Sequence, residues 1–289
     1  MFYSSVRTII VVPWTPLLDT GSIATDRRLP ATVSGDIDVQ RFRSGLRRAA
    51  VRQGASDRIL RALIAVARRV VAWRVEPTGF DRLPIGIHGR PAAGCLVVAA
   101  PHRAWIDPFL VLAAWPPDAA RLVWFGDGPT MARSWWRRWL FPRLGMIPIT
   151  PDSGGPRAYA ALAAEAMEAG AALVIFPEKG PPSTPDTTRT ISPGFAYLAM
   201  TAGAPVIPVV LAGTHRIVRG STFTVDALAA IDVGAPDDAA FTPAGRRRAA
   251  SLTERYADAV ADVLPARTAF ADARRPIPDR WPWLATLFH

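Results

Sequence analysis

The chain has 289 residues, of which 50% are hydrophobic and 20% charged, a composition that supports a sizeable core and excludes wholesale disorder. Its formal net charge of +10 comes almost entirely from arginine, because Lys179 is the only lysine. Such a charge favours anionic partners: phospholipid headgroups, phosphorylated ligands or nucleic acid. The single cysteine, Cys95, excludes an intrachain disulfide and the usual zinc-binding cysteine pairs, and its apolar neighbours predict a buried packing residue.

Residues 1–50 show no sustained period, so we expect a loosely ordered N-terminal extension. The run "TIIVVPWTPLL" within it is too short and too interrupted by proline to span a membrane, and it lacks a convincing export cleavage site. No other apolar run reaches the roughly 18 residues that a membrane-spanning helix needs. We therefore expect the protein to stay inside the cell, where it can lie on a membrane without crossing it.

Residues 51–75 contain a strongly amphipathic segment that predicts a helix. From Ser56 to Trp73, aliphatic side chains fall on one half of a helical wheel and four arginines on the other, with Arg74 as a misfit near the end. Two interpretations remain open. The helix either packs on the domain and leaves its arginines in water, or lies in a membrane interface with its apolar half in lipid and its arginines against phosphates.

From residue 76 to residue 265, short β-like runs alternate with helix-like runs. This alternation predicts a single layered α/β domain with a largely parallel or mixed central sheet flanked by helices. The expected strands cover residues 95–100, 121–125, 146–150, 171–176 and 206–213, with a β-rich patch at 221–233. The expected helices cover residues 107–115, 133–141, 156–170, 194–203 and 243–264. Residues 266–289 form a C-terminal tail that contains proline and tryptophan.

The segment 133–141, with the sequence RSWWRRWLF, places its tryptophans on one arc of a helix and its arginines on the opposite arc. The stripe either packs on the sheet or marks a membrane–water boundary, where Trp and Arg are both favoured. Together with the helix in 51–75 and the tryptophan-containing tail, it leads us to expect a peripheral protein on the cytoplasmic face of a membrane.

Two polar clusters follow predicted strands. The sequence PHRAWID follows the strand at 95–100, and PEKG follows the strand at 171–176. In α/β sheets, sites gather where strands release into loops at their carboxyl ends. If the two strands are parallel neighbours, His102, Asp107, Glu178 and Lys179 share one edge of the sheet.

Asp107 has two possible roles, which can coexist. An aspartate before a proline is typical of a helix start, where the side chain accepts from free backbone N–H groups. A carboxylate behind His102 would instead fix the imidazole tautomer and stabilise the imidazolium that forms. The sequence contains no G-x-S-x-G nucleophile motif, so the economical scheme is direct: His102 deprotonates a bound hydroxyl, which attacks an activated acyl or phosphoryl group.

These residues resemble the motifs of the glycerolipid acyltransferase family, best known from the 1-acylglycerol-3-phosphate acyltransferases. The sequence HRAWID is similar to its His-x4-Asp motif, and LGMIPITP, FPEKGPPS and APVIPVVLAG resemble its second, third and fourth motifs in the same order. The resemblance covers roughly residues 76–213. It implies transfer of an acyl group from an acyl-CoA or acyl-carrier-protein thioester to a lipid hydroxyl, without a metal, a cofactor or an acyl-enzyme.

On this template His102 is the general base and Asp107 its partner, while the third motif helps to form the acceptor site and the second supplies framework. The expected substrate-binding residues are Arg103, Gly145, Ile147, Glu178, Lys179, Gly180 and Pro208.

The chain departs from the family where the acceptor phosphate is bound. Pro151 and Pro181 stand where the second and third motifs usually carry arginine, whose planar fork suits a phosphate. Losing two such charged contacts would weaken phosphate binding by roughly 10²–10⁴ unless other cations compensate. The candidates for compensation are Arg103, Arg157, Lys179 and Arg189. A phosphate-free acceptor such as a glycolipid therefore remains open.

Other classes of function are less favoured. A nucleic-acid binder would explain the net charge, but the arginines lie on predicted amphipathic helices and no recognition module is visible, so we expect no nucleic acid as partner. A non-catalytic lipid-binding relative would explain the altered third motif, but it has no need of both His102 and Asp107. A thioesterase, with water as acceptor, is a variant of the same chemistry.

Overall fold

A seven-stranded sheet forms the centre of the protein in the computed structural model, which describes residues 55–104, 106–127, 145–149, 155–179, 187–188 and 190–274. The strand order is β1-β9-β8-β2-β5-β3-β4, and every neighbouring pair is parallel except β8 and β9. The strands are β1 (Arg74–Thr78), β2 (Leu96–Ala100), β3 (Leu122–Asp127), β4 (Met146–Ile149), β5 (Ala172–Ile175), β8 (Val206–Ala212) and β9 (Thr222–Ala227). The predicted α/β class with a mixed, largely parallel sheet is confirmed.

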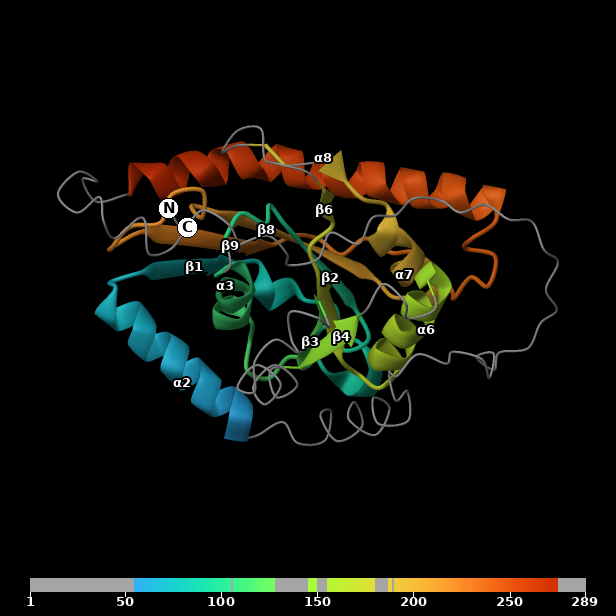
Figure 1. The fold of residues 1–289 in the computed structure, drawn as a ribbon, viewed down its shortest axis with the longest axis horizontal. Coiled ribbons are helices and arrows are strands. Elements are labelled where there is room, and N and C mark those ends of the chain that lie inside the picture. Colours follow the sequence, from blue (N-terminus) through green and yellow to red (C-terminus); the bar gives the residue numbers. More distant parts are fainter. Residues whose placement is uncertain are drawn as a thin grey trace, which may run out of the picture.

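Helices cover both faces of this sheet (Figure 1). One face packs against α6 (Gly155–Glu168), α7 (Gly194–Ala202) and the long α8 (Pro243–Ala273), and the other against α3 (Asp107–Ala114). The helix α2 (Ala55–Val70) lies beyond α3 on that second side. Two short 3-10 turns, Phe80–Arg82 and Ile87–Gly89, link β1 to β2. None of the helices in the described part of the chain is both long and apolar enough to cross a membrane.

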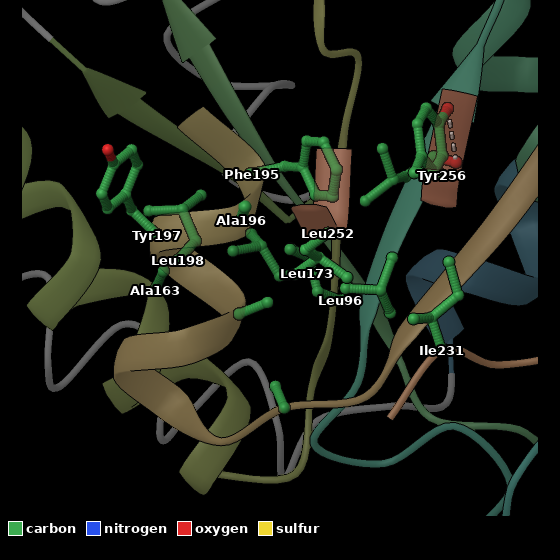
Figure 2. Close-up of a cluster of buried hydrophobic side chains, with 14 of the residues drawn as sticks. Leu96, Ala163, Leu173, Phe195, Ala196, Tyr197, Leu198, Ile231, Leu252 and Tyr256 are labelled. Carbon is green, nitrogen blue, oxygen red and sulfur yellow. Dashed lines mark hydrogen bonds between the residues drawn. The ribbon is translucent and has the colours of Figure 1, made fainter. Parts of the chain in front are cut away.

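The central strands read as continuous aliphatic runs because both of their faces are covered. All residues of β2 and β8 are buried. Along β2, Leu96 and Val98 join the core under α7 and α8, whereas Val97 and Ala99 join the core under α3. Figure 2 shows the first of these cores, in which Leu96 and Leu173 of the sheet lie with Phe195 of α7 and Tyr256 of α8.

The amphipathic helix ends earlier than its pattern predicts. We expected it to run to Arg74, within residues 51–75, but α2 ends at Val70, and Ala72 adopts a left-handed backbone (φ 56°). Arg74, the misfit of the helical pattern, opens the edge strand β1, which pairs with β9. Tertiary pairing explains the difference, because the Trp73 ring packs edge-on against Phe223 at 5.5 Å and donates to the carbonyl of Val218.

The helix α2 packs against α3, as the first interpretation expects, but not with all of its arginines in water. Arg61 donates to the carbonyl of Trp115, at the end of α3, at 2.6 Å, and Arg68 is half-buried. Val66 and Val70 are 60% and 69% exposed. The interpretation with a solvated arginine face is therefore wrong for Arg61 and Arg68, since the helix turns these toward the protein and turns two valines outward.

The helix α8 is longer than predicted, since it continues from residue 264 to Ala273 with Pro265 inside it. Pro265 lies on the exposed side, where water can satisfy the carbonyl that the proline leaves unbonded. Beyond it, Thr268 and Ala271 are buried, and Arg267 pairs with the buried Asp226 at 2.6 Å. These contacts stabilise the helical conformation of the residues that follow Pro265. The predicted tail 266–289 is therefore wrong for residues 266–273, which belong to α8. The rest of that tail from residue 275, the predicted extension 1–50 and the helix 133–141 lie outside the described residues.

Gly145 gives a test of the register between β3 and β4. Its φ is +77°, and an added Cβ would lie 2.7 Å from the carbonyl oxygen of Leu122. We predict that Gly145→Ala lowers the free energy of unfolding by about 2–4 kcal/mol, measured by urea denaturation, because backbone strain adds to the clash. Gly234→Ala is the matched control: φ is +80° but nothing lies within 4 Å of its Cβ. It should cost only about 1–2 kcal/mol. Equal losses would contradict the close approach at Gly145.

Candidate active site

A histidine–carboxylate pair lies where β2 releases into α3. The Nδ1 atom of His102 lies 2.8 Å from Oδ2 of Asp107, whose side chain is fully buried. The same oxygen accepts from the backbone N–H groups of Arg103 at 2.7 Å and Ala104 at 2.8 Å. The loop between strand and helix is thus folded around one carboxylate oxygen.

The predicted helix-capping role of Asp107 is wrong in its geometry. Asp107 is the first residue of α3 rather than its cap, which is Ile106, and no side chain caps the helix. The carboxylate instead points back and satisfies N–H groups of the preceding loop. Pro108 stands in the first turn, as predicted, because its fixed φ suits that position.

The pairing determines which nitrogen of His102 can act as a base. A carboxylate only accepts hydrogen bonds, so Nδ1 carries the proton and donates a hydrogen bond to Asp107. The other nitrogen, Nε2, then holds a lone pair. The His102 side chain is 15% exposed, which leaves part of the ring accessible. The arrangement can take a proton from a group that approaches Nε2.

Two aromatic rings support the imidazole from β5 and β3. Phe176, directly after β5, stacks on His102 with ring centroids 4.3 Å apart and planes 25° apart. Trp124 of β3 continues the stack, 6.3 Å from Phe176. Neither residue is among those that the sequence predicts for the site. Their signal was available, because Phe176 precedes the PEKG cluster and Trp124 lies on the next strand of a parallel sheet.

The second polar cluster meets the first, as predicted for parallel neighbours. β2 and β5 pair in parallel, with Val98 opposite Ile175. Glu178, which is 5% exposed, accepts the backbone N–H of His102 through Oε2 at 2.6 Å. Glu178 and Lys179 are not a loop as expected but form β6, which pairs with β7 (Thr190–Ile191).

The remaining predicted substrate-binding residues are scattered. The Arg103 guanidinium donates to the carbonyl of Thr187. Pro208 lies in β8 opposite Val98, two residues before the end of β2. Gly145 precedes β4 and so lies at the opposite end of the parallel sheet from His102. Of Lys179 and Ile147 the structure describes the backbone alone, in β6 and β4, and Gly180 lies outside the described residues.

Cys95 is not placed to act as a nucleophile. It lies just before β2, at the amino end of the strand whose carboxyl end carries His102, and it is 1% exposed. Burial raises the pKa of its thiol to about 11. Among the described residues, no three His, Cys, Asp or Glu side chains gather as a metal site would need.

Comparison with known proteins gives a family model that matches part of the chain and a similar solved structure. Residues 85–212 match the model of the Acyltransferase family, a segment that contains His102, Asp107 and Glu178. The solved structure of the 1-acyl-sn-glycerophosphate (LPA) acyltransferase PlsC from Thermotoga maritima is similar to this chain at 18% sequence identity. That match covers 71% of this chain and 79% of the other, with a TM-score of 0.47.

Cys95 yields a direct test of the buried strand. With a pKa of about 11, roughly one thiol in a thousand is ionised at pH 8, and the thiolate is the reactive form. We predict that a chromogenic disulfide reagent leaves the folded protein unmodified at pH 8 for hours and modifies one thiol at once in denaturant. Rapid modification of the folded protein would contradict a buried Cys95.

Proposed function

We propose, from the premise that residues 85–212 are an acyltransferase-family domain, that this protein moves a fatty acyl group from a thioester to a hydroxyl of a lipid. The observation that carries the proposal is the hydrogen bond between His102 Nδ1 and Asp107 Oδ2. It leaves Nε2 to act as a general base at the carboxyl end of β2.

In the proposed mechanism the acceptor hydroxyl lies against Nε2 of His102. The imidazole takes the hydroxyl proton while the oxygen attacks the thioester carbonyl carbon, and a C–O bond forms. Asp107 holds the ring and stabilises the imidazolium. When the intermediate collapses, the C–S bond breaks and the imidazolium returns the proton to the departing thiolate. No acyl-enzyme is required, which agrees with the position of Cys95.

The proposed donor is acyl-CoA or an acylated acyl carrier protein, and no metal or other cofactor takes part. Both donors are anionic, and the net charge of +10 favours their approach to the protein. Membrane lipids are the other proposed partners, and nucleic acid is not one.

The proposed acceptor is a lysophospholipid, with a phosphate-free lipid such as a glycolipid as the alternative. Pro151 and Pro181 replace two family arginines, and two of the cations that were candidates to compensate have other contacts. Arg103 bonds to the carbonyl of Thr187, and the Arg157 guanidinium lies 5.6 Å from the centre of the Phe241 ring. Of the four candidates, Lys179 and Arg189 are then left to bind the phosphate of a lysophospholipid.

We also propose that the protein is peripheral, with α2 as its anchor at the cytoplasmic face of a membrane. Val66 and Val70 point outward, as an interfacial helix requires, and Arg69 beside them is exposed and can reach a lipid phosphate. A lipid acceptor stays in the bilayer, so attachment would bring it to the site.

The catalytic proposal predicts a large effect at His102. His102→Ala should lower acyl transfer at least ~10²-fold, in the range of a lost general base. Asp107→Asn should lower it by roughly 10²–10⁴, because an amide can donate to Nδ1 and reverse the tautomer. The measurement is incubation with labelled acyl-CoA and a panel of lysophospholipid, glycolipid and hydroxylated-lipid acceptors, followed by product identification.

Thermal unfolding of both variants serves as the control for folding. If the Asp107→Asn variant folds and keeps full activity, the role of Asp107 is structural and not catalytic. Lipid binding without turnover on any acceptor would favour the non-catalytic relative, and release of free fatty acid would identify a thioesterase.

The anchoring proposal predicts weaker binding to anionic vesicles when α2 loses its outward valines. Val66→Glu with Val70→Glu should lower vesicle affinity at least ~10-fold in flotation, because each buried valine contributes roughly 1 kcal/mol or more. Ile85→Glu with Ile87→Glu is the control. These isoleucines lie outside α2 and are 70% and 40% exposed, and the two substitutions add the same charge. Equal losses would contradict α2 as the anchor.

A further inference from the structure

A buried carboxylate from another strand holds the backbone of His102. Glu178 is 5% exposed, and its Oε2 accepts the His102 N–H at 2.6 Å across 76 positions of sequence. An ionised carboxylate loses its hydration on burial and needs hydrogen bonds in return. Bonds from N–H groups to a carboxylate are shorter and stronger than neutral ones, and this distance is of that kind. Oε2 of Glu178 is thus committed to the protein itself.

Glu178 completes a pattern that Asp107 begins. The backbone N–H groups of His102, Arg103 and Ala104 are consecutive, and each donates to a carboxylate: the first to Glu178 and the other two to Asp107. The two acids come from different elements, β6 and α3. The loop is therefore fixed from two sides, and its direction sets where the imidazole of His102 points.

The helix α8 lies close behind this arrangement. Tyr256 is fully buried and donates from its hydroxyl to the carbonyl of Val98, in the strand that leads to His102, at 3.3 Å (Figure 2). Burial raises the pKa of the Tyr256 hydroxyl well above its usual value, and the negative charge of Glu178 raises it further. The charge of Glu178 therefore affects Tyr256 in α8, which lies on the face of the sheet opposite α3.

We propose that Glu178 is a positioning residue: its carboxylate fixes the backbone of His102, and so the direction of Nε2, without touching the acceptor. The proposal rests on the proposed function, in which His102 is the base. It replaces the acceptor-binding role that the family resemblance implies for Glu178. A small displacement of a general base is costly, since misplacement by about 1 Å can lower a rate ~10²-fold.

The kinetic test compares Glu178→Ala, Glu178→Gln and the control Asp226→Asn in the full chain. The control loses another buried carboxylate, which lies in β9 and pairs with Arg267. Glu178→Ala should lower kcat about 10²-fold and leave the KM of the acceptor within about twofold. Glu178→Gln should keep most of kcat, because its amide oxygen still accepts the His102 N–H, and Asp226→Asn should keep kcat. A raised acceptor KM with an unchanged kcat in Glu178→Ala would overturn the proposal.

A second readout does not depend on activity. The chain has four histidines, so ¹⁵N-histidine labelling gives four backbone amide signals, and the signal lost in His102→Gln identifies residue 102. Glu178→Ala should move the His102 amide proton upfield by more than the other three, and Asp226→Asn should leave it in place. An unmoved signal would overturn the proposal. If the wild-type protein shows no transferase activity but Glu178→Ala still shifts the His102 amide signal, the proposed function is overturned and the contact between Glu178 and His102 is supported.

Discussion

The buried carboxylate of Asp107 is the constraint around which the site is built. A charge removed from water must be satisfied by donors, and here one oxygen receives two backbone N–H groups and the ring of His102. The same bonds that satisfy Oδ2 therefore bend the loop between β2 and α3 and fix the tautomer of the imidazole. Local structure and chemistry depend on one group.

The sheet brings the rest of the site to this loop. β2 lies between β8 and β5, so two parallel strands release their chains next to each other. Phe176 and Glu178 follow β5 and reach the ring and the backbone of His102 respectively. Because β2, β5 and β8 are apolar, the polar side chains of the site lie where β2 and β5 end.

In the proposed function, chemistry and acceptor recognition are separable. The pair that would move the proton is intact, whereas prolines stand where the motifs that the sequence resembles usually carry two arginines. Charge remains abundant, but it is distributed over the chain as arginine rather than concentrated at those positions. An enzyme with the proposed function could keep one reaction while its acceptor changes, because the base needs only a hydroxyl and the acceptor site recognises what surrounds it.

The sequence alone determined the class of fold, the position of most strands and helices, and the pairing of His102 with Asp107, because apolar periodicity and strand-end polarity are local signals. It also indicated that Glu178 would lie near His102, on the condition that two strands were parallel neighbours. Only the tertiary structure decided that condition, together with the early end of α2, the passage of α8 through Pro265 and the aromatic stack of Phe176 and Trp124. Each of these depends on contacts between residues distant in sequence, where packing and pairing outweigh the local preference of the chain.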